Sequence, residues 1–489
     1  MGQLDHGTRA STTVALLLLA GCPDAAEEQR GPPPLPHVED LGGPRMTRPQ
    51  LVQIFYSDDP DIARLTEFSR WIVASTWLTA VGSEYGIGAG SLLGTVVLPA
   101  RAPAMIDDDT IADLLFAGVA DRTLPLPASG NPSDALYIIN FPAGTMTRTR
   151  AETGCVEFGG YHESERRNGV ELVYAVVPTC HDFFHGATDL EVRELVNSHE
   201  LIESVTDPIP ANHPAFQVVD PTTSWLALGR EVGDLCGRGD VTAAWHEAGF
   251  VAQRSWSNLA AAVGDPCVPS ETERPYFNVA AAGDTLLRIG PGGRATIDLA
   301  GWATGPMPDW EVAAVAAKPG QAALTLGAAR LGPDRRTTLT IDVPATTAAS
   351  TALRFYVFSS LAQGDYQLLP MLAVIDEPCA AFTGCADCTS HPGCGFCTTT
   401  GRCEAQAAVG SADSTCAASS FAIWPGSCAG VCAAHAASCA DCTAQLGCGW
   451  CDSHGGQCVE ASPDHSHPLA GACDYEEWSF AEEYCSTGG

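Results

Sequence analysis

The chain has 489 residues, of which 45% are hydrophobic and 17% are charged. It can therefore bury several hydrophobic cores, and a disordered polyelectrolyte is excluded. The 58 acidic residues outnumber the 25 Lys and Arg residues, giving a formal net charge of −33. Nucleic acid is thereby excluded as a partner, because an acidic surface repels phosphate.

The N-terminus has the features of an export signal. Arg9 precedes a short apolar stretch over residues 13–20, which is too short to cross a bilayer as a helix. The Leu-Ala-Gly-Cys sequence that ends at Cys22 resembles a bacterial lipobox, which implies a lipoprotein signal peptide over residues 1–22 and lipidation of Cys22. The lipid would anchor the protein to a membrane of the cell envelope, at the outer membrane or the extracellular side. The alternative is a plain secretory peptide with a chance cysteine.

The segment after the signal divides into a tether and a first folded domain. Residues 23–50 are rich in Pro, Gly and acidic residues, which predicts a tether. The first domain is expected over residues 51–269, where strands and helices alternate and predict a mixed α/β fold. The expected strands are residues 51–56, 94–98, 136–141 and 171–177, and the expected helices are residues 61–78 and 109–118.

The cysteine content indicates an oxidising destination. Of the 21 cysteines, an even number remains for disulfides if Cys22 carries lipid. The first domain holds Cys155, Cys180, Cys236 and Cys267, which can form two disulfides. We favour the pairs Cys155–Cys180 and Cys236–Cys267, although the sequence leaves the other pairings open.

One predicted helix carries residues with metal-binding chemistry. Thr188 and Glu191 have the spacing of a capping box at its start, and Pro208 ends it. His199 and Glu203 are four residues apart and share a face of this helix. That face continues an apolar stripe, so both side chains are expected to point toward the interior; the stripe consists of Val192, Leu195, Val196, Ile202 and Val205. A buried carboxylate needs a partner, and a metal ion is a suitable one.

The motif around His199 predicts a zinc site. Glu200 follows His199, where HExxH zinc peptidases keep their general base, although Glu203 replaces the second histidine and makes the motif HExxE. A catalytic zinc needs three protein ligands and an open position for water. The third ligand is expected from residues 229–236, as Asp234 or Glu231, with Asp207 and Asp220 as further options. The hypothesis is a zincin-like zinc metallohydrolase that acts on peptide bonds with Glu200 as general base. The alternative is a structural helix whose His and Glu residues bind no metal.

Residues 136–236 resemble bacterial relatives of the plant phosphate-induced (EXORDIUM-like) family. The shared pieces are a Tyr-Ile-Ile strand, Gly-Tyr-His after Cys155, a Tyr-Ala-Val strand that leads to Cys180, and Val-Thr-Asp-Pro ending at Pro208. The plant members are extracellular growth-related proteins with no established catalysis, and they have Thr-Asn-Pro where this chain has Thr-Asp-Pro. The resemblance therefore implies an extracellular protein and supplies no enzymatic precedent. His181 and His185 are a further candidate ligand pair, but we favour loop residues beside the Cys180 disulfide.

Residues 276–375 have a different pattern. Short β-prone runs recur between turn signals, without helical periodicity and without cysteine. This pattern predicts an antiparallel β-sandwich that serves as a spacer or a binding module. The expected strands are residues 285–289, 295–299, 310–316, 337–343, 353–359 and 366–374.

The C-terminal part holds an internal repeat of eight cysteines over residues 379–428 and again over residues 432–485. Each copy contains Cys-Ala-Asp-Cys-Thr and then Gly-Cys-Gly-aromatic-Cys, with Phe396 in the first copy and Trp450 in the second. The first copy has Cys379, Cys385, Cys388, Cys394, Cys397, Cys403, Cys416 and Cys428, and the second has Cys432, Cys439, Cys442, Cys448, Cys451, Cys458, Cys473 and Cys485.

These repeats resemble plexin–semaphorin–integrin (PSI) modules. The resemblance implies four disulfides in each copy, pairing the first cysteine with the fourth, the second with the eighth, the third with the sixth and the fifth with the seventh. Modules this small depend on such cross-links. A zinc ribbon is the alternative that the CxxC spacings leave open. PSI modules position neighbouring domains, so the second functional hypothesis is a non-catalytic surface protein that contacts a protein or glycan. Trp424 and Trp478 are expected to pack inside the two modules.

Overall fold

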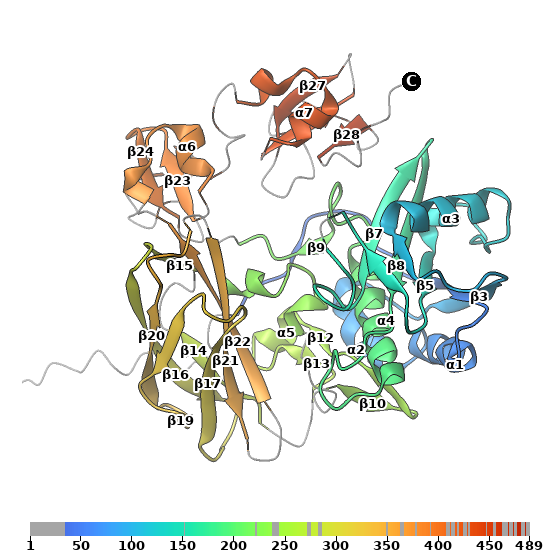
Figure 1. Cartoon of the computed structure of the whole chain (residues 1–489), viewed down its shortest axis with the longest axis horizontal. Helices are drawn as coiled ribbons and strands as arrows, with labels where there is room; N and C mark the ends of the chain where they lie inside the picture. The colour runs from blue at the N-terminus through green and yellow to red at the C-terminus, as the bar shows by residue number, and fades with distance from the viewer. Residues whose placement is uncertain are drawn as a thin grey trace, which may run out of the picture.

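The computed structural model describes residues 35–485, and Figure 1 shows its α/β domain, its β-sandwich and two small modules. The predicted signal peptide, Cys22 and Trp424 lie outside the described residues. Among the described residues, no helix has the length and apolar character needed to cross a membrane. Besides the two ends, the description omits residues 151, 221–222, 237–243, 271–274, 282–285, 349–350, 362–365, 377–378, 392, 407–410, 412–415, 418–419, 424–427, 429–430, 446, 453–455, 462–467, 469–472, 474–476 and 481–484.

A five-stranded mixed sheet forms the centre of the α/β domain, in the order β3-β2-β5-β8-β7. Four strands are parallel: β2 (Gln50–Tyr56), β3 (Ser91–Leu98), β5 (Leu136–Asn140) and β8 (Val170–Val177). Strand β7 (Tyr161–Arg167) pairs antiparallel with β8 at the edge. A separate parallel pair joins β4 (Met105–Asp107) and β6 (Met146–Arg148).

Helices cover both faces of this sheet because its strands alternate apolar side chains between the faces. Leu51, Leu136 and Val173 point to the face covered by α1 (Ile62–Ile72), α2 (Thr76–Gly82) and α4 (Asp189–Thr206). Val52 and Tyr137, which follow in the same strands, point to the face covered by α3 (Asp108–Ala120). The central strands are therefore buried on both sides.

Helix α4 has the start and end expected from the sequence. Thr188 and Glu191 form the capping box, and the helix stops at Thr206, before Asp207 and Pro208. A buried amide side chain ties it to the sheet, because Asn197 accepts a hydrogen bond from Gln53 at 3.2 Å. Hydrogen bonds between buried amides fix the rotation of a helix, so this bond fixes α4 against the sheet, and α4 also contacts β7.

The prediction of a tether over residues 23–50 is wrong for residues 35–50. Strand β1 (Glu39–Asp40) pairs with β9 (Phe216–Gln217), and Val38 and Met46 are buried in the core of the α/β domain. Asn258 accepts a hydrogen bond from the backbone of Val38 at 3.0 Å. The composition of this segment hid its few apolar anchors, so the folded domain begins earlier than expected.

The rest of the α/β domain is a series of short elements closed by disulfides. Cys155–Cys180 and Cys236–Cys267 are both formed, in agreement with the favoured pairing. The second disulfide fixes the loop after α4 against the end of the domain. The elements are η3 (Ser224–Ala227), η4 (Asp234–Cys236), β10 (Trp245–Glu247), β11 (Phe250–Ala252), β12 (Ser255–Trp256), α5 (Asn258–Ala261) and β13 (Cys267–Val268).

The second domain is a sandwich of a four-stranded sheet, β14-β16-β20-β18, and a five-stranded sheet, β15-β22-β21-β17-β19. Its inner faces share one core that includes Trp310, Leu339 and Phe355. The expectation of a purely antiparallel sandwich is corrected at one pair, because β15 runs parallel to β22. The strands are β14 (Phe277–Ala281), β15 (Leu286–Ile289), β16 (Arg294–Ala303), β17 (Trp310–Ala316), β18 (Ala323–Leu326), β19 (Arg330–Leu331), β20 (Arg336–Asp342), β21 (Thr351–Ser360) and β22 (Tyr366–Ile375).

The two C-terminal modules share one architecture. The first contains α6 (Cys385–Thr389), β23 (Cys394–Cys397), β24 (Arg402–Ala405) and β25 (Phe421–Ala422). The second repeats this order with α7 (Cys439–Thr443), β26 (Cys448–Cys451), β27 (Gln457–Glu460) and β28 (Trp478–Ser479). Their cysteines pair in the expected order: 379–394, 385–428, 388–403 and 397–416, then 432–448, 439–485, 442–458 and 451–473. Trp478 is buried, as expected.

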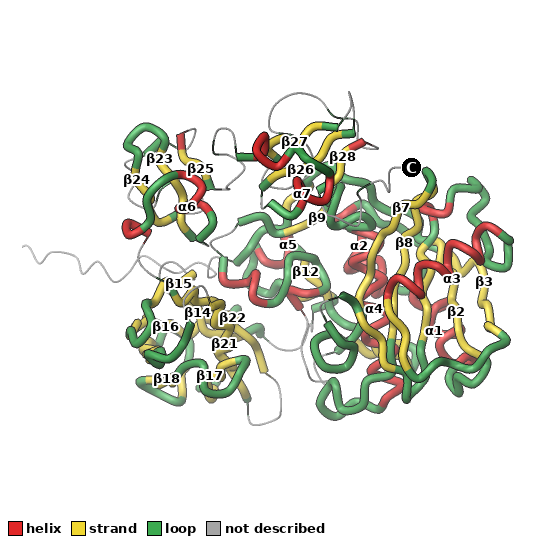
Figure 2. The backbone as a smooth tube through the Cα atoms, turned by 45° about the horizontal axis from the view of Figure 1, so that its top comes forward, coloured by secondary structure: helices red, strands yellow, loops and turns green. Residues whose placement is uncertain are grey.

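The parts of the chain contact one another at defined points. Ser224 in the α/β domain donates a hydrogen bond to Pro370 in the sandwich at 2.7 Å, and Arg288 pairs with Asp376 at 3.2 Å next to the first module. The second module reaches back to the α/β domain, where Asn212 accepts a hydrogen bond from the backbone of Phe480 at 3.0 Å. Asn212 lies between α4 and β9, so this contact brings the second module toward β9 (Figure 2).

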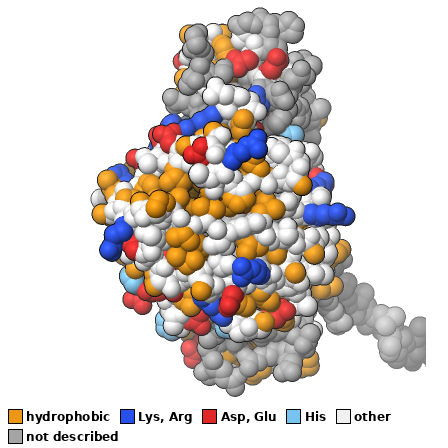
Figure 3. Space-filling view, turned by 90° about the vertical axis from the view of Figure 1, so that its right-hand side faces the viewer, with side chains coloured by type: hydrophobic (Ala, Val, Ile, Leu, Met, Phe, Trp, Pro, Cys, Tyr) orange, Lys and Arg blue, Asp and Glu red, His pale blue; other side chains and the backbone are white. Residues whose placement is uncertain are grey.

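The two edges of the α/β sheet differ in character. Strand β3 forms one edge, where Val97 is 46% exposed, and Figure 3 shows a patch of hydrophobic side chains on that side of the molecule among scattered charged ones. Strand β7 forms the opposite edge and packs against α4. The candidate site described next lies at the β7 edge, away from the hydrophobic patch.

Candidate metal centre

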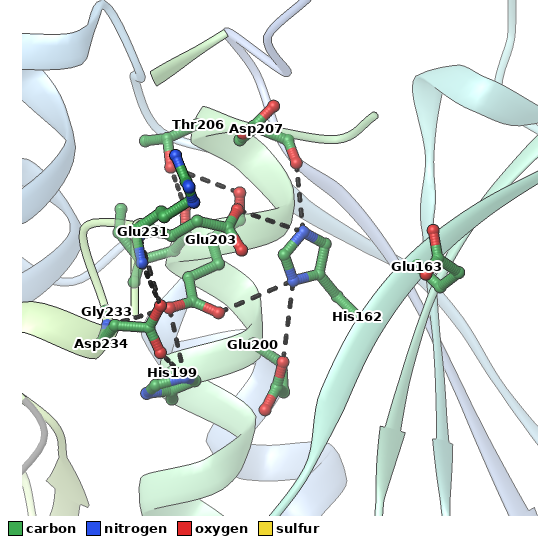
Figure 4. Close-up of polar contacts among 12 residues, drawn as sticks. His162, Glu163, His199, Glu200, Glu203, Thr206, Asp207, Glu231, Gly233 and Asp234 are labelled. Atoms are coloured by element: carbon green, nitrogen blue, oxygen red, sulfur yellow. Dashed lines mark hydrogen bonds and ion pairs between the residues drawn. The ribbon is translucent and has the colours of Figure 1, made fainter. Parts of the chain in front are cut away.

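Three segments bring titratable side chains together, as Figure 4 shows. Helix α4 contributes His199, Glu200 and Glu203, strand β7 contributes His162, and the loop before η4 contributes Glu231, with Asp234 opening η4 itself. The deep part of this cluster is buried, since His162 and Glu200 have side chains only 3% and 2% exposed. His199 and Asp234 are 22% and 26% exposed, so solvent reaches the cluster from their side.

The first set of converging atoms comes from His199, Glu203 and Asp234. His199 Nε2 lies 3.2 Å from Glu203 Oε1 and 3.9 Å from Asp234 Oδ1. Ligand atoms around a tetrahedral zinc lie roughly 3.3 to 3.6 Å apart, given metal–ligand bonds of about 2.0 to 2.2 Å. The His199–Glu203 separation is close to this range, the His199–Asp234 separation is slightly longer, and all three atoms lie within 4.8 Å of one another, so a small shift would let them hold a small divalent cation.

A hydrogen bond from the far side of the His199 ring, to Gln253, fixes the tautomer of a neutral ring. His199 Nδ1 donates to Gln253 Oε1 at 3.1 Å, and Gln253 Nε2 donates to the carbonyl of Gly233 at 2.8 Å, which sets the orientation of the Gln253 amide. A neutral His199 then directs the Nε2 lone pair at the two carboxylates. Histidines that ligate a metal usually donate their other ring N–H to an outer hydrogen-bond acceptor in this way.

The loop that carries Asp234 is held in place by its own backbone. Asp234 Oδ2 accepts hydrogen bonds from the backbone N–H groups of Arg230 and Glu231 at 3.0 and 3.2 Å. The backbone N–H of Asp234 donates to Glu203 Oε1 at 2.9 Å, and the Cys236–Cys267 disulfide follows directly. Asp234 is thereby fixed with one oxygen toward the loop and the other toward His199.

His162 reaches the cluster because β7 approaches α4 closely at Gly160. A Cβ at that position would lie 2.4 Å from Val196 Cγ1 and 2.7 Å from Glu200 Oε1, so only glycine fits there. His162 Nε2 donates to the carbonyl of Asp207 at 3.1 Å. Glu231 Oε1 lies 3.5 Å from the same nitrogen.

Burial and mutual repulsion dominate the electrostatics of the carboxylates. Burial raises the pKa of Glu200 to about 8 and, together with Glu203, the pKa of Asp234 to about 7. Burial also raises the pKa of Glu231 well above its usual value. Burial would raise the pKa of Glu203 as well, but His199 and His162 lower it to about 2. Without a metal, the cluster therefore retains protons that ordinary carboxyls would release.

The histidines respond in the opposite way. Burial alone would lower the pKa of His199, but Glu203 beside it raises this pKa well above its usual value. Burial also disfavours the charged form of His162, and Glu231 and Glu203 outweigh it and raise the pKa. Within the described part of the chain, no Arg or Lys forms an ion pair with these carboxylates, so protons or a bound cation must balance their charge.

The structure sorts the candidates that the sequence proposed. Asp234, rather than Glu231, joins His199 and Glu203. Asp207 is engaged elsewhere, because its carboxylate accepts hydrogen bonds from Ala215 N and Gln217 Nε2, both at 2.8 Å. Asp220 belongs to neither cluster of converging ligand atoms in the described residues, and neither do His181 and His185, which are exposed.

Two residues of the site were missed as functional candidates. His162 was noted only within the Gly-Tyr-His piece of the family resemblance, and Gln253 was not considered. His162 had no hydrophobic signal in the sequence, because β7 is almost entirely polar and its burial of His162 and Ser164 appears only in the structure. Gln253 has no local signal, because its role depends on contacts across 54 residues to His199.

Comparison with known proteins adds little to this geometry. No family model and no curated protein match the sequence. Domains 4 and 5 of the S-layer protein SbsC are similar at 14% identity and a TM-score of 0.17, over 21% of this chain and 54% of that one. The VesB protease of Vibrio cholerae is similar at 12% identity and 0.17, over 28% and 40%, and a GH5 xyloglucanase of Bacteroides ovatus at 13% and 0.14, over 20% and 19%. The chain thus spans about half the length of the SbsC fragment. Scores this low indicate neither fold nor function.

The disulfides define the class of protein. Ten are formed among the described residues, eight of them in modules whose buried clusters consist largely of cysteine. Such bonds persist in oxidising compartments and are rare in the cytosol. The chain is a multidomain, disulfide-rich extracellular or cell-surface protein.

Proposed function

We propose that this protein is a zinc-dependent hydrolase of zincin-like type that cleaves peptide bonds at the cell surface. The observation that carries the proposal is the convergence of His199 Nε2, Glu203 Oε1 and Asp234 Oδ1, with the His199 lone pair directed at the two carboxylates by Gln253. Three protein ligands with the fourth side open to solvent are what a catalytic zinc requires. Zinc suits a mixed imidazole and carboxylate set.

The surrounding sheet supports a peptide as the substrate. Strand β7 pairs only with β8 among the described strands, so its outer edge can take up an extended segment. Peptides commonly bind by adding a strand to such an edge, because the main chain supplies the hydrogen bonds. His162 in β7 lies beside Glu200 and Glu203, which would bring a peptide paired with β7 close to the metal ligands.

The chain's own residues supply the proton transfers. Zinc, when bound, would polarise the scissile carbonyl and make a water molecule nucleophilic. Glu200 would accept the proton of that water as its oxygen attacks the carbonyl carbon, and would pass the proton to the nitrogen when the C–N bond breaks. A nearby cation lowers the pKa of a buried carboxyl, which would make Glu200 available as a base near neutral pH.

The Glu200→Gln variant tests this role. The full chain with its disulfides formed is expected to contain zinc and to cleave peptides from a mixed library. Glu200→Gln should keep the ion held by His199, Glu203 and Asp234, while turnover falls by about 10²- to 10⁴-fold. His199→Ala should lose that ion, and His181→Ala, which removes an exposed histidine, should change neither property. Metal content and cleavage rates are the measurements. A folded wild-type protein without zinc would leave the alternative, a surface protein that contacts a protein or glycan through its sandwich and modules.

Gly233→Ala should weaken zinc binding without removing any ligand. A Cβ at Gly233 would lie 2.6 Å from Glu203 Oε1 and 3.0 Å from its Cγ and Cδ. Glu203 is buried and cannot move without leaving His199. We expect a loss of at least about 10- to 100-fold in metal affinity, which is the range for mutations of the groups that only orient metal ligands. A zinc titration measures the change, with Gly88→Ala as control, because its Cβ would meet only an ordinary contact at 3.5 Å. Equal affinities for the two variants would contradict the role given to Glu203.

We also propose that lipid on Cys22 anchors the protein to the envelope and holds the site at the membrane surface. The proposal is supported by the Leu-Ala-Gly-Cys sequence and by the oxidising location that the disulfides indicate. Cys22→Ser should move the protein from the membrane fraction to the soluble exported fraction. Fractionation of cells that produce the wild-type protein or Cys22→Ser measures this, and equal membrane retention of the two would contradict the lipid anchor.

A further inference from the structure

Glu203 has a histidine on each side. Its Oε1 lies 3.2 Å from His199 Nε2, and its Oε2 lies 3.6 Å from His162 Nδ1. The proposed function uses only the first of these contacts. A carboxylate whose two oxygens face two separate imidazole nitrogens has the geometry of a bridging ligand.

His162 is oriented in the same manner as His199. The hydrogen bond from Nε2 to the carbonyl of Asp207, at 3.1 Å, fixes the proton of a neutral ring on that nitrogen. The lone pair is then on Nδ1, which faces Glu203 Oε2 at 3.6 Å and Glu200 Oε2 at 3.8 Å. These separations are close to the roughly 3.3 to 3.6 Å between ligands of a small divalent ion. His162, Glu200 and Glu203 thus form a second set of converging ligand atoms.

An unsatisfied atom points into this second set. Glu200 Oε2 is buried and has no hydrogen-bond partner, and the Glu200 side chain is only 2% exposed. A buried carboxylate oxygen without a partner is costly, so its presence indicates a missing positive group. Within the described residues, its contact with His162 Nδ1 is 3.8 Å long, which is longer than a hydrogen bond.

We propose that a second divalent cation binds between His162, Glu200 and Glu203, and that Glu203 bridges it to the first. The inference rests on the proposed function, because it extends the same metal-binding helix. It makes the centre a two-metal site, in which two cations share the charge that develops on the reacting oxygens. Glu200 would hold the second ion through Oε2 and act as the base through Oε1. Each ion would have one oriented histidine, because His162 donates a hydrogen bond to the Asp207 carbonyl and His199 donates one to Gln253 Oε1.

Metal content tests the second site directly. The full chain would be produced with its disulfides formed in zinc-supplemented medium, because a buried site fills as the protein folds. After dialysis, the wild-type protein is expected to hold two zinc ions per chain. His162→Ala should hold one, and His181→Ala should hold two as the matched control. Circular dichroism would establish that each variant is folded.

Manganese provides a second readout, which reports the distance between the ions rather than their number. Two Mn²⁺ ions bridged by Glu203 should give an exchange-coupled electron paramagnetic resonance spectrum in the wild-type protein, and His162→Ala should give the spectrum of an isolated ion. A wild-type protein with one ion and an uncoupled spectrum would overturn the second site and leave the proposed function standing. Two ions retained in His162→Ala would also overturn it. A folded wild-type protein without metal would overturn both.

Discussion

Reduction of the disulfides should unfold both C-terminal modules while the sandwich remains folded. The buried cluster of the first module consists of Cys379, Cys388, Cys394 and Cys403, with Phe382 and Phe396 packed against it. The second repeats this arrangement around Trp450. Each module has four cross-links between residues 15 to 46 positions apart, and loops of these lengths contribute about 3 to 4 kcal/mol each. Without them, cores made of cysteine cannot offset the chain entropy.

Hydrogen exchange before and after reduction measures this prediction. Backbone amides of β23 and β26 should be protected in the oxidised protein and should exchange freely in the reduced one. The sandwich serves as the internal control, because it contains no cysteine and has its own core of apolar side chains. Protection of β23 and β26 that survives reduction would show that burial, rather than the cross-links, stabilises the modules.

Hydrophobic pattern predicted most elements of the α/β domain but missed the strand that completes the site. The run at residues 51–56 corresponds to β2 (Gln50–Tyr56), and the run at 171–177 corresponds to β8 (Val170–Val177). Strand β7 (Tyr161–Arg167) is almost entirely polar, because it lies at the sheet edge and turns its inward positions to a polar cluster. A strand that buries His162 and Ser164 has no apolar alternation to detect.

Local spacing explains which ligands the sequence could identify. His199 and Glu203 follow from the period of one helix, and the helix boundaries followed from Thr188 and Pro208. The choice between Glu231 and Asp234 could not be made, because the two residues lie in one loop and point to different histidines. Asp234 is the ligand because the backbone N–H groups of Arg230 and Glu231 hold its carboxylate in place. These hydrogen bonds form only in the folded loop, so the sequence does not reveal them.

Average composition gave a wrong prediction for the segment before β2, because a few buried apolar residues hold this otherwise polar segment to the domain. The segment before β2 has the Pro, Gly and acidic content of a tether, yet Val38 and Met46 are buried. Two anchors and the short pairing of β1 with β9 hold it to the domain. Six sandwich strands were located, but β14, β18 and β19 were missed. The parallel pairing of β15 with β22 depends on where the chain enters the sheet, which no local pattern encodes.

The metal-free protein should lose stability as the pH rises from about 5 to 8, and zinc should reverse this trend. The pKa of Glu200 is raised to about 8 and that of Asp234 to about 7, whereas unfolded carboxyls titrate near pH 4. Over this range the folded state holds protons that the unfolded chain has released. Its stability is therefore greatest below the unfolded pKa and declines as the pH rises through the folded values, by about 1.4 kcal/mol per pH unit for each such proton. The raised pKa values of His199 and His162 act in the same direction above pH 6.5.

Zinc replaces those protons, so its affinity should increase over the same pH range. Thermal unfolding of the full chain between pH 5 and 8, with a chelator or with excess zinc, compares the two states. The melting temperature should fall with pH in the chelator and rise in zinc. The double variant Glu200→Gln, Asp234→Asn should show a flatter profile in the chelator, because neither amide titrates, and this difference assigns the slope to the cluster. A wild-type profile in the chelator that matches the double variant would mean that these two carboxyls are ionised without metal, and the electrostatic need for a bound cation would disappear with it.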